Sequence, residues 1–328
     1  MNDALTARWG NPSAVHRLGI EAARLLRTAR QDVAEAMGAE TERVFFTSGG
    51  TEADNWAIFS AAERLGKRGR HIVTTAVEHH AVLHPMQKLE RQGFSVTYLQ
   101  PDAEGRVSLE ALQAALRPDT ILVSIMMVNN ESGAVMPIER MARLTHRVCP
   151  NALFHTDAVQ GFFKVPFRAR TLGADLISVS AHKVHGIKGA GALYIRPGLS
   201  LPPFVLGGGQ ESGLRSGTEN TSGIAGMVAA VQSYPFDAME RMRGLKRLLL
   251  SLLTEALPET TVAGLPVDDP HERGAYPQRV LSPGAGGNAP ARTGGGRHPA
   301  AGASECQGHL RLVVLCGRSG GSSYLQGF

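Results

Sequence analysis

Three short segments combine chemically active side chains with glycine-rich turns. In the first, at 47–52, two glycines and Thr51 precede a helical pattern. Glycine lets the backbone approach an anion closely, and free N–H groups at a helix start can bind a phosphate. An ordinary capped helix start has the same pattern. This segment alone therefore leaves phosphate binding and simple capping both open.

The second and third segments supply an acid and an amine. Asp157 follows strand-forming residues within 154–160, and it is either a helix cap or a buried carboxylate paired with a cationic ring nitrogen. Lys183 ends an apolar run, beside His182 and before a glycine-rich turn. Lysine is usually solvated, but a desolvated lysine has a lowered pKa and a free amine that can form a Schiff base. A phosphate cup, an acid and this amine are together what pyridoxal phosphate requires.

The elements that must position these groups alternate between strand and helix patterns from about residue 12 to 260. Strands are expected at 43–48, 71–77, 95–99, 120–129, 152–160 and 176–183. Helices are expected from Pro12 to Gly38, at 51–66, up to Gly93, at 109–116, at 137–148, and over most of 218–257 with a break at Tyr234-Pro235. This alternation predicts an α/β fold with a mainly parallel sheet covered by helices on both faces. Such sheets bind ligands at the carboxyl ends of their strands.

Composition narrows the class of protein. The chain has 328 residues, of which 43% are hydrophobic, so it can build a sizeable core. The formal net charge is +5, but residues 278–328 hold five arginines and one acid, which leaves +1 for the rest. This distribution argues against a nucleic-acid partner.

The sequence also argues against a membrane protein, a metal site and a disulfide framework. It has no run of the ~18–20 apolar residues that a membrane span needs, and no signal-peptide pattern at its start. Its three cysteines, Cys149, Cys306 and Cys316, have no close spacing of the kind that binds zinc or forms disulfide frameworks. We therefore expect a cytoplasmic protein without a metal.

Seven segments in order give the chain a family resemblance over residues 9–260. It resembles the class V aminotransferase-like proteins of fold type I, and within them the cysteine desulfurases and selenocysteine lyases. The segments are WGNPSAVHRLG (9–19), FFTSGGTEADNWAI (45–58), EHHAV (78–82), VNNESGAVMPI (128–138), HTDAVQ (155–160), SAHKVHGIKGAGALYI (180–195) and GGGQESGLRSGTENTSGIAG (207–226). The resemblance implies pyridoxal 5′-phosphate as the cofactor.

The resemblance also implies a role for each matching residue. Lys183 would form the Schiff base, Asp157 would keep the pyridine nitrogen protonated, and His79 would stack on the ring and assist proton transfer. Thr218 would reach the phosphate in a partner subunit, which implies a homodimer. The remaining cofactor-binding residues would be Asn130 and Gln160 at the ring oxygen, and Gly50, Thr51, Ser180 and His182 at the phosphate.

The implied reaction removes sulfur from L-cysteine to give L-alanine and an enzyme persulfide, in the context of iron–sulfur cluster assembly with a sulfur-acceptor protein. The alternatives are a selenocysteine lyase, another class V aminotransferase, and a cofactor-binding remnant without turnover. Cys306 lies broadly where the family has its catalytic cysteine, but its surroundings differ, so a non-catalytic cysteine is expected.

The chain is expected to be incomplete relative to the family at both ends. We expect a cofactor-binding domain at 1–260, the start of a small domain at 261–281, and a low-complexity tail at 282–328. Residues 283–303 contain no Leu, Ile, Val, Met or aromatic residue, so burial there cannot offset a backbone entropy of about 1–2 kcal/mol per ordered residue. Their Gly, Ala, Arg and Pro content is also what a frame-shifted reading of GC-rich DNA would yield. Disorder or weak packing is therefore expected over 282–308, together with a shift of frame near residue 280.

Overall fold

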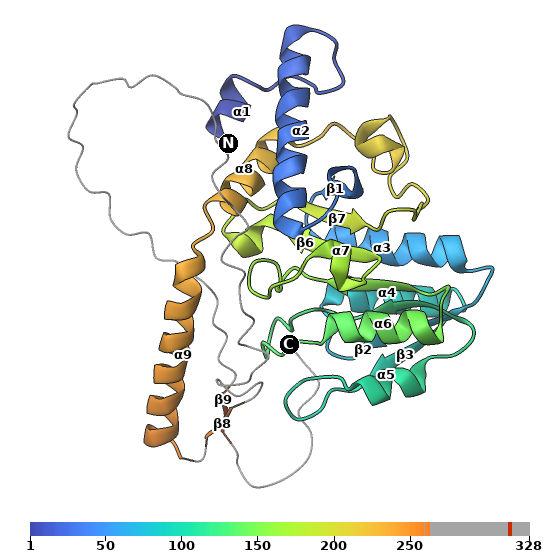
Figure 1. Ribbon diagram of the computed structural model, residues 1–328, viewed down its shortest axis with the longest axis vertical. Helices are drawn as coiled ribbons and strands as arrows, with labels where there is room; N and C mark the ends of the chain where they lie inside the picture. Colours follow the sequence, from blue (N-terminus) through green and yellow to red (C-terminus); the bar gives the residue numbers. More distant parts are fainter. Residues whose placement is uncertain (259, 263–313, 317–328) are drawn as a thin grey trace.

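A seven-stranded sheet forms the centre of the protein, in a computed structural model that describes residues 1–258, 260–262 and 314–316 (Figure 1). Its strand order is β1-β7-β6-β5-β4-β2-β3. β7 pairs antiparallel with both β1 and β6, whereas all the other pairs are parallel. The strands are β1 (Val44–Thr47), β2 (His71–Thr75), β3 (Ser95–Leu99), β4 (Thr120–Ser124), β5 (Leu153–Asp157), β6 (Leu176–Ser180) and β7 (Gly191–Ile195). The predicted mainly parallel α/β sheet is confirmed.

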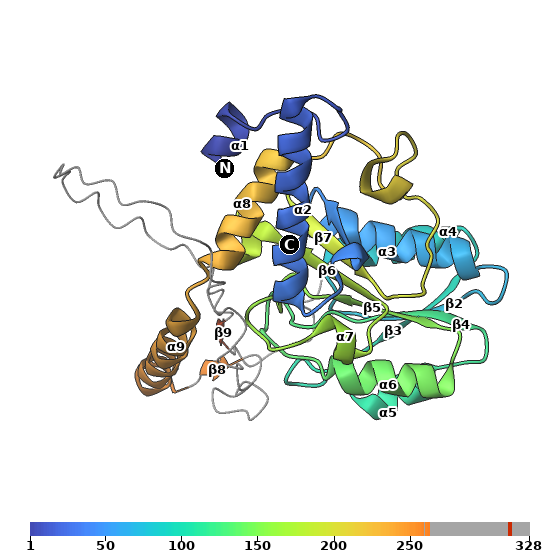
Figure 2. The same cartoon turned by 45° about the horizontal axis from the view of Figure 1, so that its top comes forward.

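Helices cover both faces of this sheet (Figures 1 and 2). The helices are α1 (Asn2–Thr6), α2 (Arg17–Met37), α3 (Gly50–Leu65), α4 (His80–Arg91), α5 (Leu109–Ala115), α6 (Ile138–Val148), α7 (Ala169–Leu172), α8 (Thr221–Gln232) and α9 (Phe236–Ala256). Short 3₁₀ turns are η1 (Thr41–Arg43), η2 (Ala181–Val184) and η3 (Gln210–Gly213). α3 packs on one face and contacts α4, while α2 packs with α8, and α5 and α6 pack with each other.

Alternating side chains divide the core into two layers. Leu122, Leu153 and Leu176 pack in the layer that contains α3 and α4. Their strand neighbours Val123 and Phe154 pack in the opposite layer, which contains α2 and α6. Successive residues of a strand point to opposite faces, so a sheet that is buried on both faces is apolar at nearly every position.

The structure differs from the sequence expectations in several details: the helix expected from Pro12 begins at Arg17, and the strand expected at 176–183 ends at Ser180. The strand expected at 120–129 ends at Ser124, because the chain then leaves the sheet, although the N–H groups of Ile125 and Met127 still donate to carbonyls of His155 and Asp157 in β5. β7 (GALYI) was not predicted; it pairs with β6, which precedes it, and with β1, far away in the sequence.

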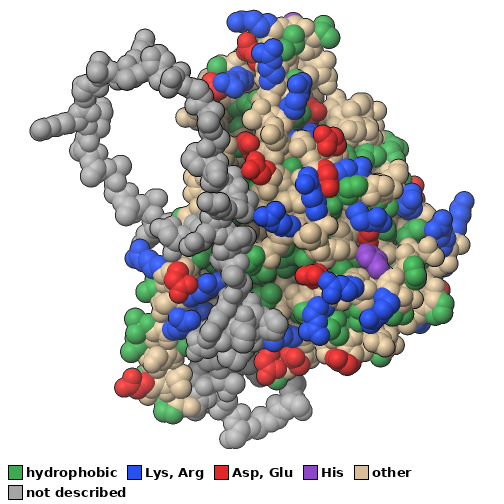
Figure 3. Space-filling model, viewed as in Figure 1, with side chains coloured by type: hydrophobic (Ala, Val, Ile, Leu, Met, Phe, Trp, Pro, Cys, Tyr) green, Lys and Arg blue, Asp and Glu red, His purple; other side chains and the backbone are tan. Residues whose placement is uncertain are grey.

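The carboxy-terminal expectations fall mostly outside the described residues. Only a short antiparallel pair, β8 (Thr260–Val262) with β9 (Val314–Cys316), is described there. The expectations for 261–281 and 282–328, for Cys306, and for disorder over 282–308 therefore stay predictions. Among the described residues, no helix is both long and apolar enough to cross a bilayer. On the face in Figure 3, basic and acidic side chains of the described residues are interspersed.

Candidate active site

A cleft of about 480 Å³ lies at the carboxyl ends of the parallel strands. Volumes of this size are typical of small-molecule sites. Its wall is formed by the last residues of β5 and β6, by the turns and loops that follow β1, β2, β4, β5 and β6, and by the first residues of α3. The cleft brings together nine of the ten residues expected in the site: Gly50, Thr51, His79, Asn130, Asp157, Gln160, Ser180, His182 and Lys183. The tenth, Thr218, is exposed and does not line the cleft.

The turn between β1 and α3 forms an anion cradle at one end of the cleft. Gly49 has a φ of 150°, a conformation that side-chain-bearing residues rarely adopt. A Cβ on Gly50 would lie 2.5 Å from Val159 Cγ2, so only glycine fits this turn. No side chain caps the start of α3, and its free N–H groups and the Thr51 hydroxyl face a site where an anion would be stabilised.

The turn after β6 places a hydroxyl, an imidazole and an amine beside that cradle. Ser180 Oγ lies 2.8 Å from His182 Nδ1, and Lys183 follows in η2. Burial lowers the pKa of His182, and the ammonium of Lys183 lowers it further. The expectation of a desolvated Lys183 is wrong for this open cleft: the residue is exposed, because η2 projects beyond the end of the sheet.

Asp157 ends β5 in the wall of the cleft and is 5% exposed. Its Oδ1 accepts a hydrogen bond of 2.8 Å from the N–H of Val159. Burial raises the pKa of Asp157 to about 8, with a further contribution from the nearby Asp54 carboxyl. A buried carboxyl of this kind ionises readily only when a cation binds against it.

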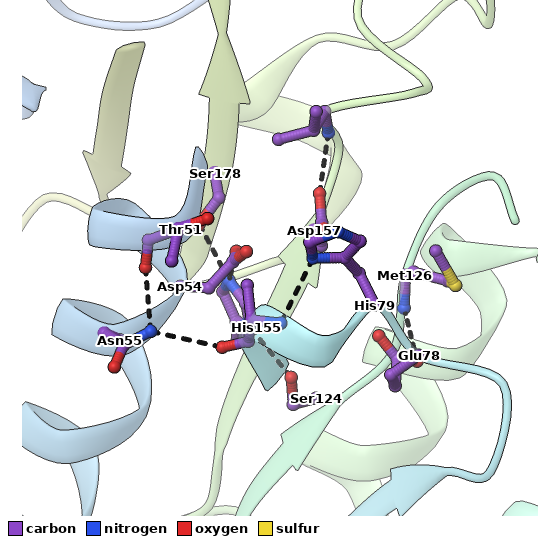
Figure 4. A network of polar contacts seen from close by, with 12 residues as sticks. Thr51, Asp54, Asn55, Glu78, His79, Ser124, Met126, His155, Asp157 and Ser178 are labelled. Carbon is purple, nitrogen blue, oxygen red and sulfur yellow. Dashed lines mark hydrogen bonds and ion pairs between the residues drawn. The ribbon is translucent and has the colours of Figure 1, made fainter. Parts of the chain in front are cut away.

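A buried polar layer lies beneath Asp157 on the α3 side of the sheet (Figure 4). His155 Nδ1 is 2.8 Å from Ser124 Oγ, and its Nε2 is 3.0 Å from Ser178 Oγ and 3.5 Å from Asp54 Oδ1. Burial lowers the pKa of His155 to about 4 and raises that of Asp54 to about 7. Both shifts favour the neutral forms, so His155 carries no positive charge that would compete with a ligand cation for Asp157.

The turn after β2 orients His79. Glu78 is buried, and its Oε1 accepts hydrogen bonds from the Thr75 hydroxyl and the Met126 N–H, at 2.8 and 2.9 Å. These bonds tie β2 to the loop after β4. His79 Nδ1 accepts from the N–H of Ala81 at 3.1 Å, which caps α4. Burial and the neighbouring His80 lower the pKa of His79, so its neutral ring carries the proton on Nε2.

Two amides face the cleft from the loops after β4 and β5. Asn130 Nδ2 donates to Glu131 Oε1 at 2.7 Å. Gln160 Oε1 accepts from Lys164 Nζ at 2.9 Å. Both amides also line the cleft and retain polar atoms for a ligand.

Sequence reasoning missed several groups of the site. Glu52, in the first turn of α3, lines the cleft and forms hydrogen bonds of 2.6 and 3.1 Å with Arg215. Asp54 and Lys188 also line the cleft. An aspartate on the buried face of α3, four residues after Gly50, was the one visible signal for this polar layer.

The residues present fit pyridoxal 5′-phosphate. The glycine turn and the start of α3 suit its phosphate, and the raised pKa of buried Asp157 suits a cationic ring nitrogen. Lys183 supplies an amine for its aldehyde in the same cleft.

Comparisons with known proteins agree with this geometry. The chain is 47% identical over 232 residues to a protein of Dictyoglomus turgidum named cysteine desulfurase IscS, a match that covers 71% of this chain and 58% of that protein. It is 46% identical over 270 residues to a cysteine desulfurase of Cereibacter sphaeroides, covering 80% and 68% respectively. The chain thus spans roughly three fifths to two thirds of the length of these relatives.

Solved structures show the same fold. A NifS-like protein aligns with a TM-score of 0.77 and 40% identity, over 80% of this chain and 73% of that one. A structure described as SspA in complex with cysteine aligns with a TM-score of 0.72 and 37% identity, over 76% and 72%. Residues 1–275 match the family described as aminotransferase class-V. The sheet, the cleft and this match together show that the chain belongs to the class V aminotransferase family.

Proposed function

We propose that this protein binds pyridoxal 5′-phosphate through Lys183 and acts as a cysteine desulfurase. The observation that carries the proposal is the meeting of an amine, a buried acid and an anion cradle in one cleft, namely Lys183, Asp157 and the turn at Gly50. The names of the relatives support the same substrate, L-cysteine. The bound cofactor would supply an electron sink for the carbanion formed when the substrate loses its α-proton.

The chain's own residues would bind and orient the reactants. The start of α3, Ser180 and His182 would hold the phosphate. The carboxylate of Asp157 would stabilise a proton on the ring nitrogen. His79, neutral and with Nε2 free to exchange a proton, would move protons at the substrate.

The sulfur step needs a thiolate. The attacking thiolate would form a bond to the substrate sulfur while the bond between that sulfur and the substrate β-carbon breaks, which gives a persulfide. Protonation of the remaining carbon skeleton would then give L-alanine. Cys149 does not suit this role: it is buried, its Sγ donates to the carbonyl of Arg117 at 3.2 Å, and burial raises its pKa. Cys306, outside the described residues, and Cys316, at the end of β9, are left as the cysteines to test.

The test measures both the visible absorbance of the bound cofactor and the products of the reaction. Purified protein is incubated with the cofactor, its visible absorbance is recorded, and alanine and sulfide are measured after addition of L-cysteine and a thiol reductant. We expect absorbance and both products in the wild type, and neither in Lys183→Ala. Absorbance without alanine would contradict the desulfurase and favour a cofactor-binding protein without turnover. Turnover lost in Cys306→Ala would overturn the expectation that Cys306 is non-catalytic, and faster turnover of selenocysteine would indicate a selenocysteine lyase.

A further inference from the structure

The turn after β5 carries a lysine that none of the roles above uses. The N–H of Phe162 donates to the carbonyl of Ala158 at 2.7 Å, and the N–H of Lys164 donates to the carbonyl of Gly161 at 2.9 Å. These successive turns bring Lys164 Nζ to 2.9 Å from Oε1 of Gln160, a residue in the wall of the cleft.

The packing around this turn holds it in one conformation. Phe162 is 1% exposed, and a Cβ on Gly161 would lie 2.4 Å from Met127 Sδ. Phe163 has a φ of 62°, although bulky residues rarely adopt this left-handed conformation. Its ring stacks on Tyr234 with the ring centres 4.8 Å apart. Strained backbone that is maintained by packing is concentrated at functional sites. Here the strained residue, Phe163, directly precedes Lys164.

The burial of Lys164 also disfavours its charged form. Burial lowers the pKa of Lys164 to about 8, and the ammonium of Lys183 contributes to the shift. Lys164 in turn contributes to the lowered pKa of His182. Cations gathered at one end of a cleft indicate that its ligand has an anionic atom there.

The contact with Lys164 determines which polar atom of the Gln160 amide is available to a ligand. An ammonium has only donors, so the Gln160 atom that faces it is the carbonyl oxygen. The amide nitrogen is then the polar atom left for the cleft. We propose that Lys164 is a positioning residue, whose ammonium holds the Gln160 amide with its N–H donors toward the cleft and supports an anionic ring oxygen of the cofactor. This inference rests on the proposed function, because it needs the cofactor to bind in this cleft.

The test measures the dissociation constant of pyridoxal 5′-phosphate and the pH dependence of its visible absorbance in four proteins: wild type, Lys164→Met, Lys164→Arg and Lys67→Met. Lys67 is an exposed lysine at the end of α3 and serves as the control. Loss of a charge-assisted hydrogen bond should weaken binding by about tenfold or more in Lys164→Met. The visible band changes when the nitrogen that joins Lys183 to the cofactor loses its proton. In Lys164→Met the pH at the midpoint of this change should rise by about one unit, because the positive charge of Lys164 no longer disfavours a proton on that nitrogen.

Arginine keeps the charge and the donors, so Lys164→Arg should stay close to wild type in both measurements, as should Lys67→Met. Lys164→Met with wild-type affinity and pH profile would overturn the proposal, and so would Lys164→Arg that behaves like Lys164→Met. A wild type that binds no cofactor would instead contradict the proposed function itself, and this inference with it.

A further variant keeps the test open if Lys164→Met does not fold. Gln160→Glu retains an acceptor for Lys164 but replaces the N–H donors by a second carboxylate oxygen. It should bind the cofactor about tenfold or more weakly. Wild-type affinity in Gln160→Glu would show that no donor is needed at this position, and would overturn the proposal.

Discussion

Asp157 combines burial at a strand end with a single backbone hydrogen bond to one of its oxygens. Among the described residues, no hydrogen bond occupies its other oxygen, which leaves that atom for a ligand cation. Beneath it, burial lowers the pKa of His155 to about 4, so this imidazole is neutral and does not compete with a ligand cation for Asp157. Asp157 is therefore a buried carboxyl with one oxygen available to a positively charged ring nitrogen.

Replacing Asp157 by Asn keeps the size of the side chain but removes this charge. The cofactor should still bind through the phosphate cradle and Lys183. Exchange of the α-proton of bound L-cysteine or L-alanine with deuterium should slow by about two to three orders of magnitude, the scale lost with a preorganised charge. Exchange by NMR measures this, and an unchanged rate would contradict the role of Asp157.

Glu78 gives a prediction of pH dependence. Burial raises its pKa from 4.5 to about 8, so between these values the folded protein binds more protons than the unfolded chain. Its contribution to stability is present below pH 4.5 and is lost as the pH rises toward 8. Glu78→Gln cannot ionise, so its free energy of unfolding relative to wild type should rise across this window by at least about 1.4 kcal/mol, the equivalent of one pKa unit.

Urea denaturation of the cofactor-free proteins at pH 5 and at pH 8 measures that difference. Asp54 and Asp157 titrate in both proteins, and because their charges also raise the pKa of Glu78, the change in the difference reports the Glu78 carboxyl together with its coupling to these two groups. A difference in stability that does not change between the two pH values would show that Glu78 is already ionised in the folded protein.

The strands and loops depend on anchors that join distant elements. Glu211, in η3, accepts hydrogen bonds of 2.6 and 2.8 Å from the guanidinium of Arg30 in α2, and one of 2.9 Å from the N–H of Phe46. β1 is an edge strand, so this carboxylate satisfies backbone that no further strand pairs. The anchor therefore holds β1, and with it the turn that leads to Gly50.

Removing the Glu211 carboxylate should destabilise the folded protein. Glu211→Ala should lower the free energy of unfolding by about 3–5 kcal/mol, because it leaves the Arg30 guanidinium and the Phe46 N–H without their partner. Glu139→Ala is the matched control: Glu139 pairs with Arg143 on the exposed surface of α6, where a loss below about 1 kcal/mol is expected. Equal effects in urea denaturation would contradict the anchor.

The elements that could be predicted from sequence are those with a local cause. Apolar runs ended by glycine or proline located the strands around Phe45 and Ile177, and the break at Pro235 separated α8 from α9. What could not be predicted depends on tertiary contacts. β7 lies between β6 and the distant β1, and the pKa values of Glu78 and His155 depend on burial that no local pattern reveals. The exposure of Lys183 was missed for the same reason.

The whole molecule is proposed to act as a homodimer. Thr218 lies outside the cleft of its own chain and is exposed, and the preceding segment is held by the bonds between Arg215 and Glu52.

Mixing two defective variants tests whether Thr218 completes a partner's site. Lys183→Ala and Thr218→Val should each bind the cofactor poorly. In a mixed dimer, one site would carry both defects and the other neither, so mixing with exchange of subunits should restore tight binding at one site. Sedimentation as a monomer with cofactor bound, or no recovery on mixing, would count against the dimer.

The most direct test of the central claim is the location of the covalent link to the cofactor. Wild-type protein is incubated with pyridoxal 5′-phosphate, reduced with borohydride, digested and mapped by mass spectrometry. We expect the reduced adduct on Lys183, in the peptide that follows β6. An adduct confined to Lys164, Lys188 or surface lysines, or no stable adduct at all, would contradict this expectation.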